Sequence, residues 1–202
     1  MSVVDHASIG AWDLSVEPPH RLLTVADLDS FPTELPSGPV DYELDNGRLV
    51  LIPPPGGTHG SIQVRVGGHL LYQGELKGHG RAFTETGIIL WRDPDCVVSP
   101  DAASICAKSL PASESAQGYL RTMPELVVEV RSKDDSAALI RRKAEHYLKA
   151  GVEVVWVVDP TTRTIVIQRS QGAVETLGLG DVLQLPGIIP DFSLAVADIF
   201  RD

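Results

Sequence analysis

PELVVEVRSKDDSAALIRRKAEHYLKAGVEVVWVVDP, residues 124–160, is the stretch of sequence that decides the fold. Residues 126–130 form a near-continuous apolar run, which is typical of a strand covered on both faces of its sheet. Residues 136–150 have helical spacing, and Gly151 is placed to end that helix. Residues 154–158 form a second apolar run. The order strand, helix, strand predicts a parallel or mixed sheet with a right-handed crossover.

Two charged residues of this stretch occupy positions that water should not reach. Glu129 interrupts the apolar run LVVEV. At 100° per residue, Lys143 falls about 40° and Tyr147 about 80° from Leu139, so the lysine lies inside the apolar stripe of its helix. A buried ionisable group is costly unless it is paired or binds a metal, and the two residues therefore suggest a functional site. Alternatively, Lys143 extends its ammonium to solvent and Glu129 pairs with Arg131.

Two further acids lie at exceptional positions of predicted strands. Asp101 follows Pro100 in VVSPDAASI, and proline in a strand marks an edge, a bulge or an end. Glu43 begins the first strand of a hairpin whose turn is predicted at Asn46 and Gly47. Taken singly, Asp101 could be a solvated turn residue and Glu43 an exposed strand residue.

Three carboxylates and a lysine together suggest metal-dependent chemistry on a phosphate. Carboxylate oxygens hold Mg²⁺ or Mn²⁺, which prefer oxygen ligands and keep several waters. Such a metal lowers the pKa of a bound water, and a neighbouring lysine orients that water or stabilises charge on a phosphate. The set therefore predicts hydrolysis of a phosphodiester bond.

The rest of the chain is predicted to form short helices and strands. A flexible arm is expected over residues 1–23 and a single domain over residues 24–202. Helices are expected at 24–31, 58–76 and 193–200, and strands at 81–91, at 97–105 with a break at Pro100, at 164–169, at 173–177 and at 182–185. The last three strands are expected to form a meander.

Composition narrows the class of protein. The chain has 202 residues, of which 43% are hydrophobic and 22% charged, as in ordinary globular proteins. A formal charge of -10 argues against sequence-independent binding to nucleic acid, yet it does not exclude a nuclease, whose metal-binding carboxylates add negative charge. No apolar run approaches the ~20 residues that cross a membrane, and the N-terminus lacks the pattern of a signal peptide. We therefore expect a cytoplasmic protein without a membrane partner, in which Cys96 and Cys106 are packed thiols.

Six pieces of the sequence resemble a known family in their order and spacing. They are YELDNGRLV, PPPGGTHG, SPDAASI, PELVVEVRS, the pair Lys143 and Tyr147, and GVEVVWVVDP. Over residues 24–200 the chain is similar to the Uma-type family of restriction endonucleases, a branch of the PD-(D/E)xK nuclease superfamily. The resemblance implies an α/β (α+β) fold: a restriction-endonuclease-like mixed β-sheet core flanked by helices, with additional N- and C-terminal antiparallel hairpins. It also implies cleavage of DNA with Mg²⁺ (or Mn²⁺) and a homodimer, because two-fold symmetry matches two sites to two strands.

The resemblance assigns roles to the acids. Asp101 matches the aspartate of the PD motif, Glu129 matches its second acid, and Glu43 matches the acid of the N-terminal element. By this resemblance Asp101, Glu129 and Glu43 are the metal ligands.

The lysine of the motif is displaced in this chain. Arg131 stands two residues after Glu129, where the superfamily pattern has lysine. Lys143 on the following helix fits the lysine role better, because arginine cannot give up a proton. Arg131 and His59 are auxiliary candidates, and His59, at the start of a predicted helix, could contact a phosphate, carry a proton or simply bond to backbone.

Two other classes of function stay open at this point. The chain could be a binding or structural module that keeps the nuclease fold but is catalytically silent. A sugar-processing hydrolase could also use paired carboxylates, but aromatic residues make up only 5% of the chain, and nothing else indicates a carbohydrate pocket.

Overall fold

The central element of the protein is a mixed β-sheet. The computed structural model describes residues 21–111, 118–132 and 135–201. Within these residues, six strands pair in the order β12-β11-β10-β9-β8-β5. Their bounds are β5 (Gly80–Phe83), β8 (Ala102–Cys106), β9 (Leu126–Val130), β10 (Val154–Asp159), β11 (Thr164–Arg169) and β12 (Glu175–Leu177). Strands β9 and β10 are parallel and the other neighbours are antiparallel, so the expected mixed sheet is confirmed.

Helix α3 (Ala137–Ala150) joins the two parallel strands, as the opening stretch of sequence predicts. The Ser136 side chain accepts a hydrogen bond from the Leu139 amide at 3.1 Å and caps the first turn. Gly151 ends the helix with a φ of 107°, a conformation that favours glycine. These two local signals explain why both ends of α3 agree with the sequence.

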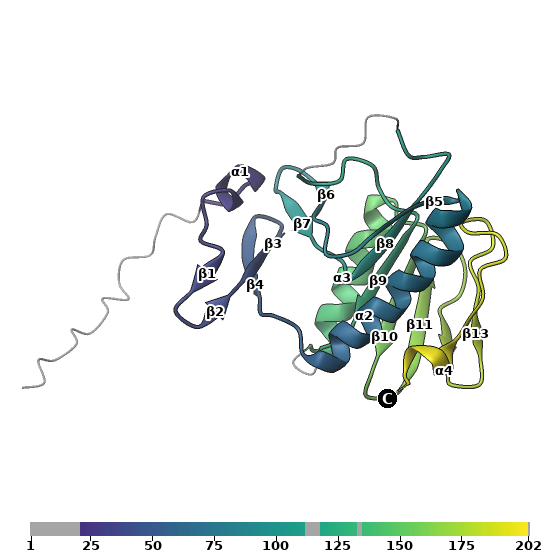
Figure 1. The fold of residues 1–202 in the computed structure, drawn as a ribbon. Coiled ribbons are helices and arrows are strands. Elements are labelled where there is room, and N and C mark those ends of the chain that lie inside the picture. Colours follow the sequence, from purple (N-terminus) through teal and green to yellow (C-terminus); the bar gives the residue numbers. More distant parts are fainter. Residues whose placement is uncertain (1–20, 112–117, 133–134, 202) are drawn as a thin grey trace, which may run out of the picture.

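Helices cover both faces of this sheet (Figure 1). Helix α2 (Gly57–His69) packs through Ile62 and Val66 on the face that carries Val128. Helix α3 packs on the opposite face, which carries Val127. Side chains alternate along a strand, so Glu129 belongs to the face that α3 covers.

A second sheet brings the N-terminal part of the chain to the site. Within the described residues, four antiparallel strands pair in the order β4-β3-β7-β6, with bounds β3 (Asp41–Asp45), β4 (Arg48–Ile52), β6 (Ile88–Trp91) and β7 (Cys96–Val98). Asn46 and Gly47 form the predicted hairpin turn with φ values of 52° and 76°. The predicted break at Pro100 is larger than expected, because β7 and β8 on its two sides belong to different sheets. Asp101 therefore lies at the junction of the two sheets.

The C-terminal segment differs from the sequence-based prediction. Strand β13 (Val182–Leu183) does not extend the meander of β10, β11 and β12 but pairs with β14 (Leu194–Ala195). The helix expected at 193–200 is reduced to α4 (Val196–Ile199), preceded by β14. Leu183 and Leu194 are both buried in the apolar cluster on the α2 face, so burial rather than local pattern selects this pairing.

The remaining elements are short. They are α1 (Val25–Leu28), β1 (Glu34–Leu35), β2 (Gly38–Pro39) and the π and 3-10 turns that continue α2, η1 (Leu70–Gly74) and η2 (Glu75–Lys77). Cys96 and Cys106 are buried free thiols, as expected, and burial raises the pKa of each to about 11. In the described part of the chain no helix is long and apolar enough to cross a membrane. The expected arm lies outside the described residues except for 21–23, and a single domain over 24–202 stays a prediction.

Candidate active site

Lys143 joins two carboxylates that come from different sheets. Its Nζ atom lies 3.0 Å from Oε1 of Glu129 on β9 and 3.2 Å from Oε1 of Glu43 on β3. Both glutamates are buried, and the lysine side chain is only 17% exposed. The alternatives of a lysine that extends to solvent and an exposed strand glutamate are therefore wrong. The structure brings these three candidates into direct contact.

Glu129 has a second donor in Tyr147. The buried Tyr147 hydroxyl donates a hydrogen bond to Oε1 of Glu129 at 2.5 Å. Arg131 does not pair with Glu129: its Nη1 atom lies 2.6 Å from Oδ2 of Asp159, and it also donates to the Asp135 carbonyl. The expected Glu129–Arg131 pair is therefore wrong, and Arg131 is held at the end of β10.

Burial and charge shape the protonation of this cluster. Burial raises the pKa of Glu129 to about 7, and the nearby Lys143 ammonium limits that rise. Burial alone would lower the pKa of Lys143, but the carboxylates of Glu129 and Glu43 outweigh it and raise that pKa. The pKa of Tyr147 is raised by burial and by Glu129, so its hydroxyl stays a donor. Lys143 is thus a fixed positive charge.

Asp101 lies beside this cluster. Ala102 of β8 is paired with Val128 of β9, so the next pair in the same register is Asp101 with Glu129. The Asp101 carboxylate is buried and accepts a hydrogen bond from the Val130 amide at 2.6 Å. It is therefore not a solvated turn residue. Asp101 contacts Val130 and His59, whereas Lys143 contacts the two glutamates.

His59 holds the other oxygen of Asp101. Its Nε2 atom lies 3.2 Å from Oδ1 of Asp101, and its side chain is 13% exposed. Burial would lower the pKa of His59, but the Asp101 carboxylate more than compensates and raises it. In the described part of the chain its Nδ1 atom is buried without a hydrogen-bond partner. His59 therefore does not only begin helix α2, because its ring contacts the carboxylate of Asp101.

Two residues near Asp101 were missed by sequence reasoning. The Gln63 side-chain amide donates to Oε1 of Glu85 at 2.7 Å and to the Asp101 carbonyl at 3.1 Å. Glu85 has a φ of 49° and follows β5. No periodicity or motif marks Glu85, since it lies between two strands. Tyr147 was expected in the core, and its i, i+4 spacing from Lys143 was the available signal for its contact with the site.

The donor set fits a divalent cation in its chemistry. Among the described residues, no group of three or more His, Cys, Asp or Glu side chains has a geometry ready to hold a metal ion. Mg²⁺, however, is commonly held by one or two carboxylates and otherwise by water, and the site offers carboxylates in Asp101 and Glu129. The site also holds three buried carboxylates, which are the oxygen donors that such a cation prefers. A cavity of about 80 Å³ borders Glu43, Glu129 and Lys143.

Comparisons with known proteins agree with this architecture. A family model described as "Uma2: Putative restriction endonuclease" matches residues 28–197. A crystal structure of "a putative nuclease belonging to DUF820" from Anabaena variabilis is similar with a TM-score of 0.70, 22% identity, and coverage of 86% of this chain and 96% of that chain. At this identity the similarity shows the fold. A comparison with curated proteins gives no match.

Proposed function

The chain belongs to the Uma2 family, and we propose that it is a metal-dependent endonuclease that hydrolyses DNA phosphodiester bonds. The observation that carries this proposal is the Lys143 ammonium, 3.0 and 3.2 Å from the carboxylates of Glu129 and Glu43. Asp101, which precedes β8 next to β9, supports the proposal as a third buried carboxylate.

The proposed metal ligands are Asp101 and Glu129, with Glu43 as a further oxygen donor. A bound Mg²⁺ or Mn²⁺ would lower the pKa of a water and neutralise charge on the phosphate. Tyr147 holds Oε1 of Glu129, and His59 holds Oδ1 of Asp101, so each of these acids is oriented by a partner.

Lys143 supplies the fixed positive charge. As the water oxygen bonds to phosphorus and the bond to the leaving oxygen breaks, negative charge grows on the phosphate oxygens. The ammonium donates hydrogen bonds to those oxygens or orients the attacking water, and both roles favour the transition state. Arg131 is paired with Asp159, so its proposed role is to support the end of β10.

The test is cleavage of supercoiled plasmid with Mg²⁺ or Mn²⁺. Asp101→Asn and Glu129→Gln should abolish cleavage, whereas Glu175→Gln on β12 should cleave like the wild type. Thermal unfolding should show that all three variants are folded. Cleavage that persists in both site variants would end the claim for this site.

A catalytically silent module is the second candidate, and the lack of a ready three-ligand group among the described residues favours it. Calorimetric titration with Mn²⁺ separates the two. An active site should release or absorb heat on binding, and Asp101→Asn should remove that heat. A silent module should show no heat in either protein.

The remaining proposal concerns the oligomeric state of the enzyme. We infer a homodimer, because two symmetric sites can address the two strands of a duplex. Light scattering at micromolar concentration should give twice the chain mass of 21.7 kDa. A monomer under those conditions would contradict the dimer.

A further inference from the structure

An uncharged row of residues runs along the outer side of helix α2 and the turns η1 and η2 that continue it. We call this set of positions, each four residues from the next, the apolar row: Gly60, Val64, Gly68, Tyr72 and Leu76. Val64, Tyr72 and Leu76 are 73, 69 and 69% exposed, and a glycine lies on either side of Val64. Residues four apart form the ridges through which helices pack on one another.

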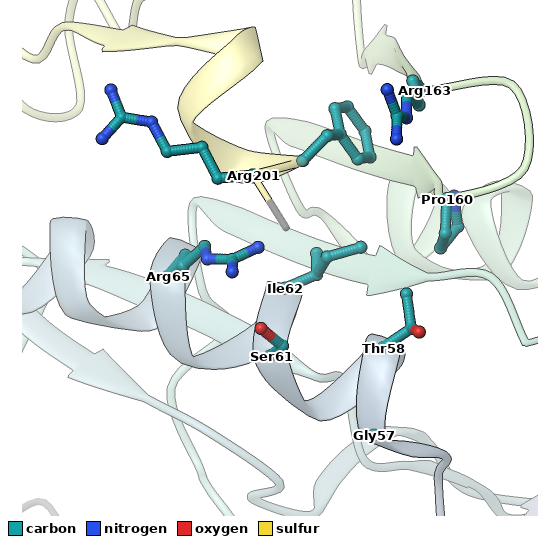
Figure 2. Close-up of a pocket in the computed structure, with 9 residues that line it drawn as sticks. Gly57, Thr58, Ser61, Ile62, Arg65, Pro160, Arg163 and Arg201 are labelled. Atoms are coloured by element: carbon teal, nitrogen blue, oxygen red, sulfur yellow. The ribbon is translucent and has the colours of Figure 1, made fainter.

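The polar side chains on both flanks of the apolar row are bound within the protein. On one flank Gln63 donates to the Asp101 carbonyl at 3.1 Å. On the other flank Arg65 donates to the Ile199 carbonyl at 2.9 Å and is turned toward helix α4 (Figure 2). The polar groups of α2 therefore serve the fold and the site, and the apolar row between them faces outward.

The two glycines of the apolar row are not required by the packing of the chain on itself. In the described part of the chain, a Cβ atom added to Gly60 or Gly68 would meet no atom within 4 Å. Gly67 differs, because a Cβ atom there would lie 3.1 Å from the Thr84 side chain. Glycine inside a helix is less stable than alanine, so the two open glycines destabilise the isolated chain. They are favourable where another backbone approaches the helix closely.

We propose that the apolar row is the contact between two copies of this chain. The inference rests on the proposed function, in which the enzyme is a homodimer, and it names the surface that forms the dimer. Each copy has a formal charge of -10, so two copies repel each other unless the facing surfaces lack acidic groups. No side chain of the apolar row is charged. A two-fold contact joins a surface to itself, and the projecting side chains of one row fit over the glycines of the other.

Helix α2 also holds one acid of the candidate active site. His59 contacts the Asp101 carboxylate at 3.2 Å, and Gln63 contacts the Asp101 carbonyl. Helices packed through the apolar row have axes about 8–10 Å apart. Each Asp101 is therefore held by a helix that also forms the dimer contact, and the dimer fixes its two sites relative to each other.

Sedimentation velocity of the full chain over a dilution series measures the dissociation constant of the dimer. Val64→Lys places two like charges in a two-fold contact and should raise that constant by at least about tenfold. Gly68→Leu fills the space for the second backbone and should raise it by a similar factor. Val174→Lys makes the same change at a valine that is 64% exposed outside the apolar row, and it should leave the constant unchanged.

Thermal unfolding of protein diluted to the monomer separates an effect on the dimer from an effect on the fold. Val64→Lys should then be as stable as Val174→Lys, and Gly68→Leu should have a slightly raised Tm, because leucine favours a helix. A lower Tm of Val64→Lys than of Val174→Lys would show that the chain itself covers the apolar row, and it would overturn the proposal.

The remaining outcomes separate this surface from the proposed function. A dimer that both Val64→Lys and Gly68→Leu leave intact would overturn this surface and leave the homodimer standing. A wild type that is monomeric at micromolar concentration would overturn the surface and the homodimer together. Metal-dependent plasmid cleavage by the wild type tests the nuclease proposal independently of either result.

Discussion

Replacing Lys143 by methionine removes the charge that makes two buried carboxylates tolerable. Methionine keeps an unbranched apolar stem but leaves Glu129 and Glu43 without the ammonium now 3.0 and 3.2 Å away. Removing one partner of a buried ion pair costs about 3–5 kcal/mol. For a chain of this size that corresponds to a decrease in Tm of about 6–20 °C. Lys149→Met on the same helix should cost only about 0.5–1 kcal/mol, because it loses an exposed contact with an aromatic ring.

A double variant shows whether charge is the cause. Adding Glu129→Gln to Lys143→Met removes the unpaired carboxylate, so the double variant should be more stable than Lys143→Met alone. The coupling energy from this double-mutant cycle measures the interaction directly. Urea unfolding in the presence of a chelator keeps metal out of the comparison.

The pH dependence gives an independent check. Burial already raises the pKa of Glu129 to about 7, from an ordinary 4.5, and loss of Lys143 raises it further. Between pH 4.5 and about pH 7, the folded protein therefore binds more protons at Glu129 than the unfolded protein does. Stability falls as pH rises through this range, because the unfolded state loses its proton first. The deficit of Lys143→Met should therefore be larger at about pH 8 than at about pH 5. Equal stability of wild type and variant at both pH values, or a double variant no better than the single one, would refute the reasoning.

Two further substitutions divide the roles of neighbouring side chains. Tyr147→Phe removes a hydrogen bond to the buried Glu129 carboxylate and should lower the free energy of unfolding in urea by about 1–3 kcal/mol. Tyr72→Phe, at a side chain that is 69% exposed, should leave that free energy unchanged. Equal effects of the two substitutions would contradict a role for the Tyr147 hydroxyl. Arg131→Gln should keep the rate of plasmid cleavage within about tenfold of the wild type, whereas Lys143→Met should lower that rate by about 10²–10³-fold. A larger loss in Arg131→Gln than in Lys143→Met would assign the lysine role to Arg131.

The fold was predictable where local signals agree with packing. The order strand, helix, strand across residues 124–160, the Ser136 and Gly151 ends of α3 and the hairpin turn at Asn46 are encoded in neighbouring residues, and all are present. The placement of β13 in the meander was wrong, because a strand of two residues carries no information about which strand it pairs with. Only burial against the α2 face selects β14.

The candidate site was predictable in part. A charge in an apolar run and a charge in an apolar stripe marked Glu129 and Lys143 without any structure. The contact of Lys143 with Glu43 joins residues 100 positions apart, and it forms because the second sheet packs against α3. The contact of His59 with Asp101 joins α2 to the break between two sheets. No spacing along the chain specifies either distance.

By itself, the sequence determined which residues are costly to bury and which local turns and helix ends the chain forms, because hydrophobic periodicity and backbone preferences act over a few residues. Only the tertiary structure decided which acids share one ammonium, that Arg131 binds Asp159 instead of Glu129, and which side of α2 faces outward. The physical reason is that charges pair according to distance and burial in space, and both are set by how sheets and helices pack.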